Sequence, residues 1–143
     1  ELICSVHPHV PAQLRGDPKR LQQILMNLTA NAIKFTEGGE VVVRATKDEE
    51  TDQDLTVRFT VTDTGIGIPK NEHERVFTKF FRAENALLAQ TDGTGLGLYL
   101  AKNIIHQHQG EMSFTSKEGK GTAFSFSIPK DKENKKKSFA KSS

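Results

Sequence analysis

An unbroken alternation of apolar and polar side chains runs through residues 55–63. Apolar residues hold every second position, so they share one face of a β-strand, and threonine or arginine holds the other face. A strand that buries only one face favours a sheet covered on one side by helices. Asp63 ends the run on the apolar face. A carboxylate there is costly unless a ligand or a buried partner donates hydrogen bonds to it.

A helix is predicted to begin at the Asp-Pro pair 17–18, a strong start signal, and to run to about Phe35. At about 100° per residue its apolar side chains form one stripe. Asn27, Asn31 and Lys34 form a separate polar stripe beside it. For the helix alone, solvated surface is the simplest explanation of this polar stripe. The neighbouring segments favour a binding role instead.

Two glycine-rich segments follow in the chain. The first, residues 63–69, continues from the strand, and its glycines allow a sharp turn and the close approach of a flat ligand. The second, residues 93–98, precedes a predicted helix over 98–109 that Gly110 stops. Backbone amides freed by glycine at a helix N-terminus bind phosphate. Taken singly, an ordinary turn and a flexible hinge are the alternatives.

The remaining segments complete a two-layer α/β (α+β) sandwich. Residues 1–6 and 39–46 are predicted strands, and residues 48–54 a polar hairpin loop. A last hairpin turns at 118–121. We expect helices to cover one face of a mixed sheet. The inward positions of the last hairpin are Met112, Phe114, Phe124, Phe126 and Ile128.

The order of these segments resembles the ATP-binding catalytic domain (HATPase) of sensor histidine kinases, within the GHKL superfamily. The resemblance covers nearly the whole chain. It implies the GHKL fold, with the nucleotide between the helix layer and a mobile lid. The matching segments are residues 27–36 (asparagine box), 63–69 (first glycine box), 77–82 (phenylalanine box), 83–93 (lid), 93–98 (second glycine box) and 119–122 (Gly-Thr element).

The resemblance implies a site for ATP and Mg²⁺. Asn31 would coordinate Mg²⁺, and Asp63 would accept a hydrogen bond from the adenine amino group. Asn27 and Arg82 would be the catalytic pair, with Arg82 on the terminal phosphate. Superfamily ATPases carry a general-base glutamate where this chain has Asn27, and an amide cannot act as that base. The other implied ATP contacts are Lys34, Phe35, Gly65, Gly67, Ile68, Phe80, Gly93, Thr94, Gly95, Leu96, Gly97, Leu98 and Thr122.

The implied function is that of a protein-histidine kinase in two-component signal transduction. The γ-phosphoryl group would pass to a histidine on a separate dimerisation and phosphotransfer domain, and then to a response regulator receiver domain. His73 does not resemble that acceptor, because the motif around it runs into the phenylalanine box, and we interpret it as a solvated helix residue. Two alternatives stay open: a GHKL ATPase that drives conformational change, and a nucleotide-binding regulatory module without transfer activity.

Composition fits one domain over residues 1–129 and a charged, disordered tail or linker over 130–143. The net charge of +2 is too small to favour nucleic acid. A lone Cys4 suits the reducing cytoplasm, and no apolar stretch reaches membrane-spanning length. The chain lacks an initial Met, so we expect a piece of a longer protein, which could be a membrane-anchored sensor. We expect the isolated domain to be monomeric and its parent a homodimer.

Overall fold

The computed structural model describes residues 1–6, 18–50, 54–79, 81–84 and 97–131. Its helical elements are α1 (Pro18–Lys34), the 3₁₀-helix η1 (Lys70–Arg75) and α3 (Gly97–Gln107). Its strands are β1 (Leu2–Val6), β2 (Val41–Glu50), β3 (Asp54–Asp63), β4 (Glu111–Lys117) and β5 (Gly121–Asp131).

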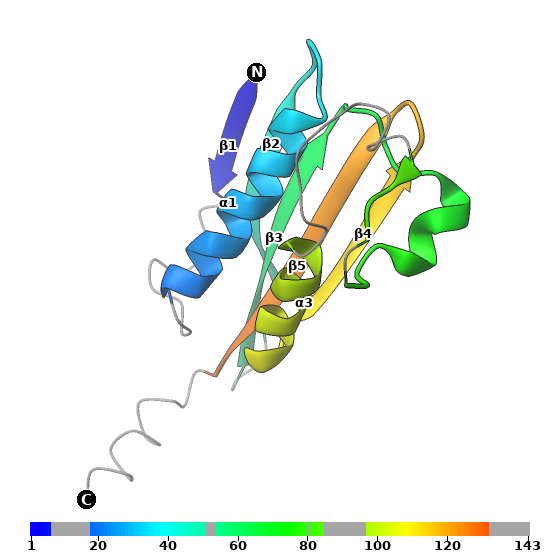
Figure 1. The fold of residues 1–143 in the computed structure, drawn as a ribbon. Coiled ribbons are helices and arrows are strands. Elements are labelled where there is room, and N and C mark those ends of the chain that lie inside the picture. The colour runs from blue at the N-terminus through cyan, green and yellow to red at the C-terminus, as the bar shows by residue number, and fades with distance from the viewer. Residues whose placement is uncertain (7–17, 51–53, 80, 85–96, 132–143) are drawn as a thin grey trace, which may run out of the picture.

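The five strands form one twisted sheet in the order β1-β2-β3-β5-β4. β1 runs parallel to β2, and the other neighbours are antiparallel. In Figure 1 helices α1 and α3 lie on one face of this sheet, and η1 lies beside β4. The predicted two-layer arrangement with a mixed sheet is therefore confirmed. None of the helices in the described ranges is long and apolar enough to cross a membrane.

The core lies between the two helices and the covered face of the sheet. The predicted apolar stripe of α1 faces it, with Ile24 and Leu28 almost completely buried. α3 contributes Ala101 and Ile105. From the sheet, Phe126 has no exposed surface and stacks on Phe59, with ring centroids 5.0 Å apart. Burial of these apolar side chains is the main force that holds helices and sheet together.

The hairpin between β2 and β3 is shorter than the predicted loop over 48–54. β2 continues to Glu50, and β3 begins at Asp54, with a register shift between Lys47 and Glu49. Pairing of β3 with β5 on its other side extends the ladder into this polar stretch, because strand formation depends more on neighbours than on composition. β5 likewise runs to Asp131, past the predicted boundary at 129.

Helix α3 ends in a Schellman motif two residues before the predicted end. The Gly110 N–H donates to the Ile105 carbonyl over 2.9 Å, and the Gln109 N–H donates to the His106 carbonyl over 3.0 Å. The left-handed residue of the motif is Gln109, with φ of 60°, where glycine is usual. Gly110 is required for a different reason, since a β-carbon there would collide with the Ser127 carbonyl oxygen of β5.

Two substitutions at this helix end should therefore have opposite effects. Gly110→Ala should lower the free energy of unfolding by about 2–3 kcal/mol, because the added methyl group has no room against Ser127. Gln109→Gly should raise it by about 0.5–1 kcal/mol, because glycine adopts the left-handed conformation without strain. Urea denaturation of both variants measures the two changes. Equal losses in both would contradict this explanation.

Candidate functional site

Asp63 lies half-buried at the end of β3, on the helix-covered side where the alternation places it. Its Oδ1 accepts hydrogen bonds from the backbone N–H of Gly65, over 2.9 Å, and of Thr122, over 3.2 Å. Burial raises the pKa of the carboxyl above its ordinary value, and the two backbone donors partly oppose that rise. Within the described residues no hydrogen bond reaches Oδ2. That oxygen is the acceptor a ligand would meet.

The glycine-rich loop after Asp63 is held from two sides. On the α1 side, the Ile66 N–H donates to the Phe35 carbonyl over 3.2 Å, and Gly65 lies so close to that carbonyl that a β-carbon would collide with it. On the hairpin side, the Gly119 N–H donates to the Ile66 carbonyl over 2.7 Å. Gly67 has φ of 70° and lies against the Lys117 carbonyl. The loop is thus a fixed wall of the site.

One residue of the polar stripe of α1, Asn27, lies against the start of α3. Asn27 and Asn31 are half-buried, and Lys34 is exposed. A β-carbon on Gly97 would lie 2.6 Å from Asn27 Nδ2, so the asparagine amide packs directly against the first residue of α3. Lys34 Nζ lies 5.7 Å from the centroid of the Phe35 ring. The structure therefore brings the asparagine box and the end of the second glycine box together at one place.

The phenylalanine box is anchored on the hairpin of β4 and β5. Phe77 makes edge contacts with Phe114 and Phe124, at centroid distances of 5.6 and 6.2 Å. Arg82 is half-buried and follows this anchor, outside any helix or strand. Just beyond it, the Glu84 N–H donates to the carboxylate of Glu72 in η1 over 3.2 Å. These contacts fix the base of the segment that the resemblance assigns to the lid.

His73 is not the solvated residue that the sequence predicts. Its side chain is half-buried, and its ring makes an edge contact with Phe114 at a centroid distance of 5.0 Å. Its Nε2 lies 2.9 Å from the Ile68 carbonyl oxygen. Because a carbonyl can only accept, Nε2 carries the proton. This burial results from the packing of η1 against the sheet, a non-local contact that the local sequence does not indicate.

Ser116 is a site residue that the sequence analysis did not single out. Its hydroxyl lies 2.7 Å from the hydroxyl of Thr122, which is buried, and it accepts a hydrogen bond of 2.8 Å from the Ile68 N–H. The sequence does contain a signal for Ser116, because this residue continues the inward positions of Met112 and Phe114 with a period of two. It ends an apolar face with a polar group, as Asp63 does on β3.

Several predicted site residues lie outside the described part of the chain. The same holds for most of the predicted lid over 83–93 and for Asp17. Gly97 and Leu98, by contrast, form the start of α3. The predicted nucleotide contacts outside the description are Phe80, Gly93, Thr94, Gly95 and Leu96.

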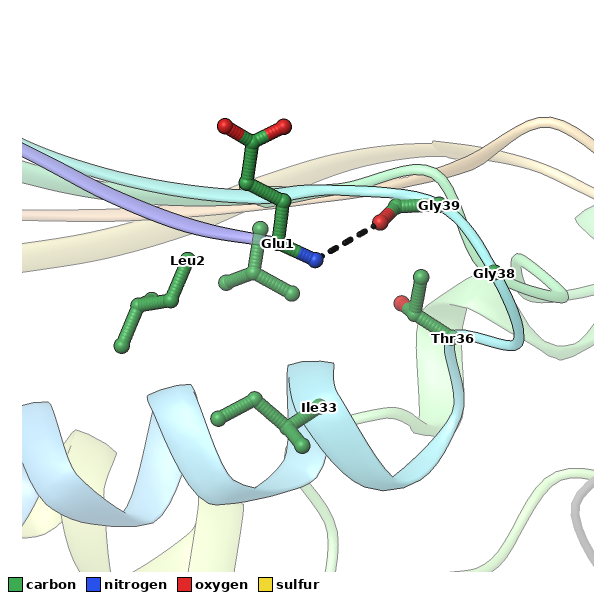
Figure 2. Close-up of a pocket in the computed structure, with 7 residues that line it drawn as sticks. Glu1, Leu2, Ile33, Thr36, Gly38 and Gly39 are labelled. Atoms are coloured by element: carbon green, nitrogen blue, oxygen red, sulfur yellow. Dashed lines mark hydrogen bonds between the residues drawn. The ribbon is translucent and has the colours of Figure 1, made fainter.

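A separate hollow of about 440 Å³ opens between β1 and the end of α1. Figure 2 shows Leu2 and Ile33 facing each other across it, with the Glu1 amino group donating to the Gly39 carbonyl over 3.0 Å. Ile33 lies about 160° around α1 from Asn31, so this hollow opens away from the polar stripe. Its lining contains none of the predicted site residues. It is formed by Glu1, Leu2, Ile33, Thr36, Gly38, Gly39 and Val41.

The donor chemistry of the site fits a magnesium ion that arrives with phosphates. In the part of the chain that the structure describes, no group of three or more His, Cys, Asp or Glu side chains could hold a metal ion. Asn31 would supply an amide oxygen, and Mg²⁺ is commonly bound through few protein ligands together with substrate phosphates and water. A protein cage is therefore not needed for this ion.

Known proteins resemble this chain in sequence and in fold. The family described as "Histidine kinase-, DNA gyrase B-, and HSP90-like ATPase" matches residues 16–132. "Sensor protein GacS" of Pseudomonas syringae pv. syringae is 44% identical over 140 residues, which cover 96% of this chain and 15% of GacS. The chain thus spans about a seventh of that relative's length.

Two solved structures are similar throughout the fold. One is full-length ShkA in complex with AMPPNP, with a TM-score of 0.73, 34% identity, and coverage of 90% of this chain and 25% of ShkA. The other is the mycobacterial sensor histidine kinase MprB, with a TM-score of 0.73, 30% identity, and coverage of 91% of this chain and 81% of that structure.

Proposed function

Because this chain belongs to the family of histidine kinase-, DNA gyrase B- and HSP90-like ATPases, we propose that it is the ATP-binding catalytic domain of a sensor histidine kinase. It binds Mg·ATP and donates the γ-phosphoryl group to a histidine on a separate dimerisation and phosphotransfer domain of the parent protein. That histidine then passes the phosphoryl group to the receiver domain of a response regulator. The domain works in the cytoplasm, where ATP is present, and the parent is a homodimer.

One observation carries this proposal: Asp63, half-buried on the covered face, has a backbone-anchored Oδ1 and no described donor at Oδ2. A fixed acceptor beside a glycine-lined loop fits the amino group of adenine. Guanine presents an oxygen at the same position, and two acceptors cannot form a hydrogen bond. The similar structure of full-length ShkA is a complex with AMPPNP, which supports nucleotide binding by this chain.

Phosphoryl transfer rather than hydrolysis is favoured by Asn27. Hydrolysis requires a group that accepts a proton from the attacking water, and a neutral amide does not do so near pH 7. Asn27 instead packs against Gly97 at the start of α3. An external histidine needs no such base, since its neutral imidazole nitrogen attacks the γ-phosphorus directly as ADP leaves. Arg82 is our candidate for stabilising the charge on the transferring group.

Calorimetric titration with ATP and GTP, each with and without Mg²⁺, tests this proposal when combined with a phosphate-release assay on the same sample. We expect selective, magnesium-dependent ATP binding and negligible release. Rapid release would favour the ATPase alternative. Absence of binding would contradict the proposal. Adding the parent's histidine domain with γ-labelled ATP should label that domain, and failure to label it would favour a regulatory module.

Asn31→Ala should abolish the magnesium dependence of ATP binding, because it removes the proposed amide ligand. We expect the tightening by Mg²⁺ to fall by at least about tenfold. Asn103→Ala is the matched control, since Asn103 is exposed on α3 and should leave the effect intact. If Mg²⁺ still tightened ATP binding to the Asn31 variant as much as before, the ligand assignment would be wrong.

A further inference from the structure

Three polar side chains form a row across the helix-covered face at the end of the sheet. Asp63 of β3 pairs with Thr122 of β5, and Thr122 pairs with Ser116 of β4. Directly paired residues on neighbouring strands place their side chains on the same face. The next row on this face is apolar, with Val61, Phe124 and Phe114. The polar row is therefore confined to the edge of the core where the glycine-rich loop begins.

The hydroxyl of Ser116 is at the centre of a small hydrogen-bond network. The Ile68 N–H donates to Ser116 Oγ over 2.8 Å. Ser116 Oγ donates to the Gly121 carbonyl oxygen over 3.0 Å and lies 2.7 Å from Thr122 Oγ1. A serine hydroxyl has one proton to donate and two lone pairs with which to accept. These three contacts therefore use the full hydrogen-bonding capacity of the Ser116 hydroxyl.

Counting protons gives the direction of the contact between the two hydroxyls. The Gly121 carbonyl can only accept, so it takes the single proton of Ser116. The short Oγ–Oγ1 contact is then a hydrogen bond only if Thr122 donates to Ser116. In the reverse arrangement Ser116 would give its proton to Thr122, and the 3.0 Å contact between Ser116 Oγ and the Gly121 carbonyl oxygen would no longer be a hydrogen bond. With its proton directed to Ser116, Thr122 offers only lone pairs to a ligand.

We infer that Ser116 is a specificity-determining residue, which fixes the Thr122 hydroxyl as a hydrogen-bond acceptor beside Asp63 and so selects a purine with an amino group at C6. The inference rests on the proposed function and deepens it. Two neighbouring acceptors suit the amino group of adenine, which carries two N–H donors. A 6-oxopurine places an acceptor oxygen there and finds no donor in this row.

Ser116 also holds the Ile68 N–H, so its loss could weaken binding simply by loosening the loop. That structural effect would weaken binding of every purine nucleotide alike. Loss of the orienting contact would instead free Thr122 to rotate and donate to a 6-oxo group. The informative quantity is therefore the ratio of dissociation constants for ITP and ATP, because these nucleotides differ only in the base at and around C6.

The test measures Mg·ATP and Mg·ITP binding by calorimetry for the unmutated chain and for Ser116→Ala. The Kd(ITP)/Kd(ATP) ratio should fall by about threefold to tenfold, the factor that one neutral hydrogen bond carries. Ser113→Ala is the matched control, an exposed serine on the same strand, and should keep the original ratio. In a Thr122→Val background, adding Ser116→Ala should change the ratio no further.

An unchanged ratio in Ser116→Ala, with selective ATP binding by the unmutated chain, would overturn this inference and leave the proposed function standing. Absence of ATP binding by the unmutated chain would overturn both. If Ser116→Ala fails to fold, Ser116→Cys serves in its place, because a thiol of similar size is a much weaker hydrogen-bonding group. The ratio should fall in that variant too, and an unchanged value would overturn the inference.

Discussion

Asp63→Asn should weaken ATP binding by about 1–3 kcal/mol, which is roughly 5-fold to 150-fold in Kd. Asparagine can keep the acceptor for the Gly65 and Thr122 amides, so the loop geometry should survive. Its amide nitrogen then replaces Oδ2 and points a donor at the amino group of adenine. Calorimetric titration measures the loss. An unchanged affinity would contradict the adenine assignment.

The same substitution should not destabilise the unliganded protein at neutral pH. Burial raises the pKa of Asp63 in the folded state, so the ionised carboxylate makes folding less favourable. This cost is present above the folded pKa and disappears as the pH falls below the unfolded value. Asp63→Asn removes the cost, so its stability gain over the unmutated chain should be present at pH 7 and shrink through that acidic window.

Denaturant unfolding at several pH values measures this stability difference. Glu111→Gln is a suitable control, because Glu111 is exposed at the start of β4. Weaker ATP binding combined with an undiminished free energy of unfolding is the pattern expected of a residue whose role is to bind a ligand. A large loss of stability at neutral pH would instead indicate that Asp63 has a structural role.

Gly121→Ala should be among the most destabilising single substitutions in the described part of the chain, with an expected loss of about 3–4 kcal/mol. Gly121 has φ of 118°, which side chains rarely tolerate, and a β-carbon there would collide with the Asp63 carbonyl oxygen. The β5 strand would have to move away from β3 at the position where Asp63 and Thr122 pair. We therefore expect loss of ATP binding as well.

Gly119→Ala in the same hairpin is the matched control. Gly119 also has a positive φ, of 80°, but no heavy atom lies within 4 Å of its β-carbon position. Its cost should be limited to the left-handed conformation, about 1–2 kcal/mol. Thermal unfolding of both variants separates backbone strain from steric collision. Equal losses at the two positions would show that the close approach to β3 contributes nothing.

Much of the fold follows from local periodicity. The apolar stripe that runs from Leu21 to Phe35 and the alternation that ends in Asp63 each specify which face is buried, because side-chain direction repeats with a fixed period in helices and strands. The half-burial of Asp63 on the helix side was predictable on this basis. The roles of Asn31, Arg82 and the nucleotide contacts stay predictions, because the resemblance supplies them.

The described structure differs from the sequence prediction where contacts are distant along the chain. His73 is half-buried because η1 packs on Phe114 of β4. Gly110 is needed because β5 passes beside the end of α3, at Ser127. Polar residues near Glu50 remain in strand β2 because they pair with β3, which is itself held on its other side by β5. The partners of His73 and Gly110 are far from them in sequence, so no local pattern indicates these contacts. Glu50 pairs with the nearby Leu55, and the distant contact in that region is the pairing of Leu55 with Lys130 of β5.

The sequence by itself determined the elements, their buried faces, and the order of motifs that identifies an ATP-binding domain. Tertiary structure alone decided how Asp63, Thr122 and Ser116 form one row, since strands from different parts of the chain must pair in a particular register. The direction of a hydroxyl proton likewise depends on which acceptors surround it in space. Local propensity sets which way a side chain faces, whereas its hydrogen-bond partners are set by the strands and loops that the fold places beside it.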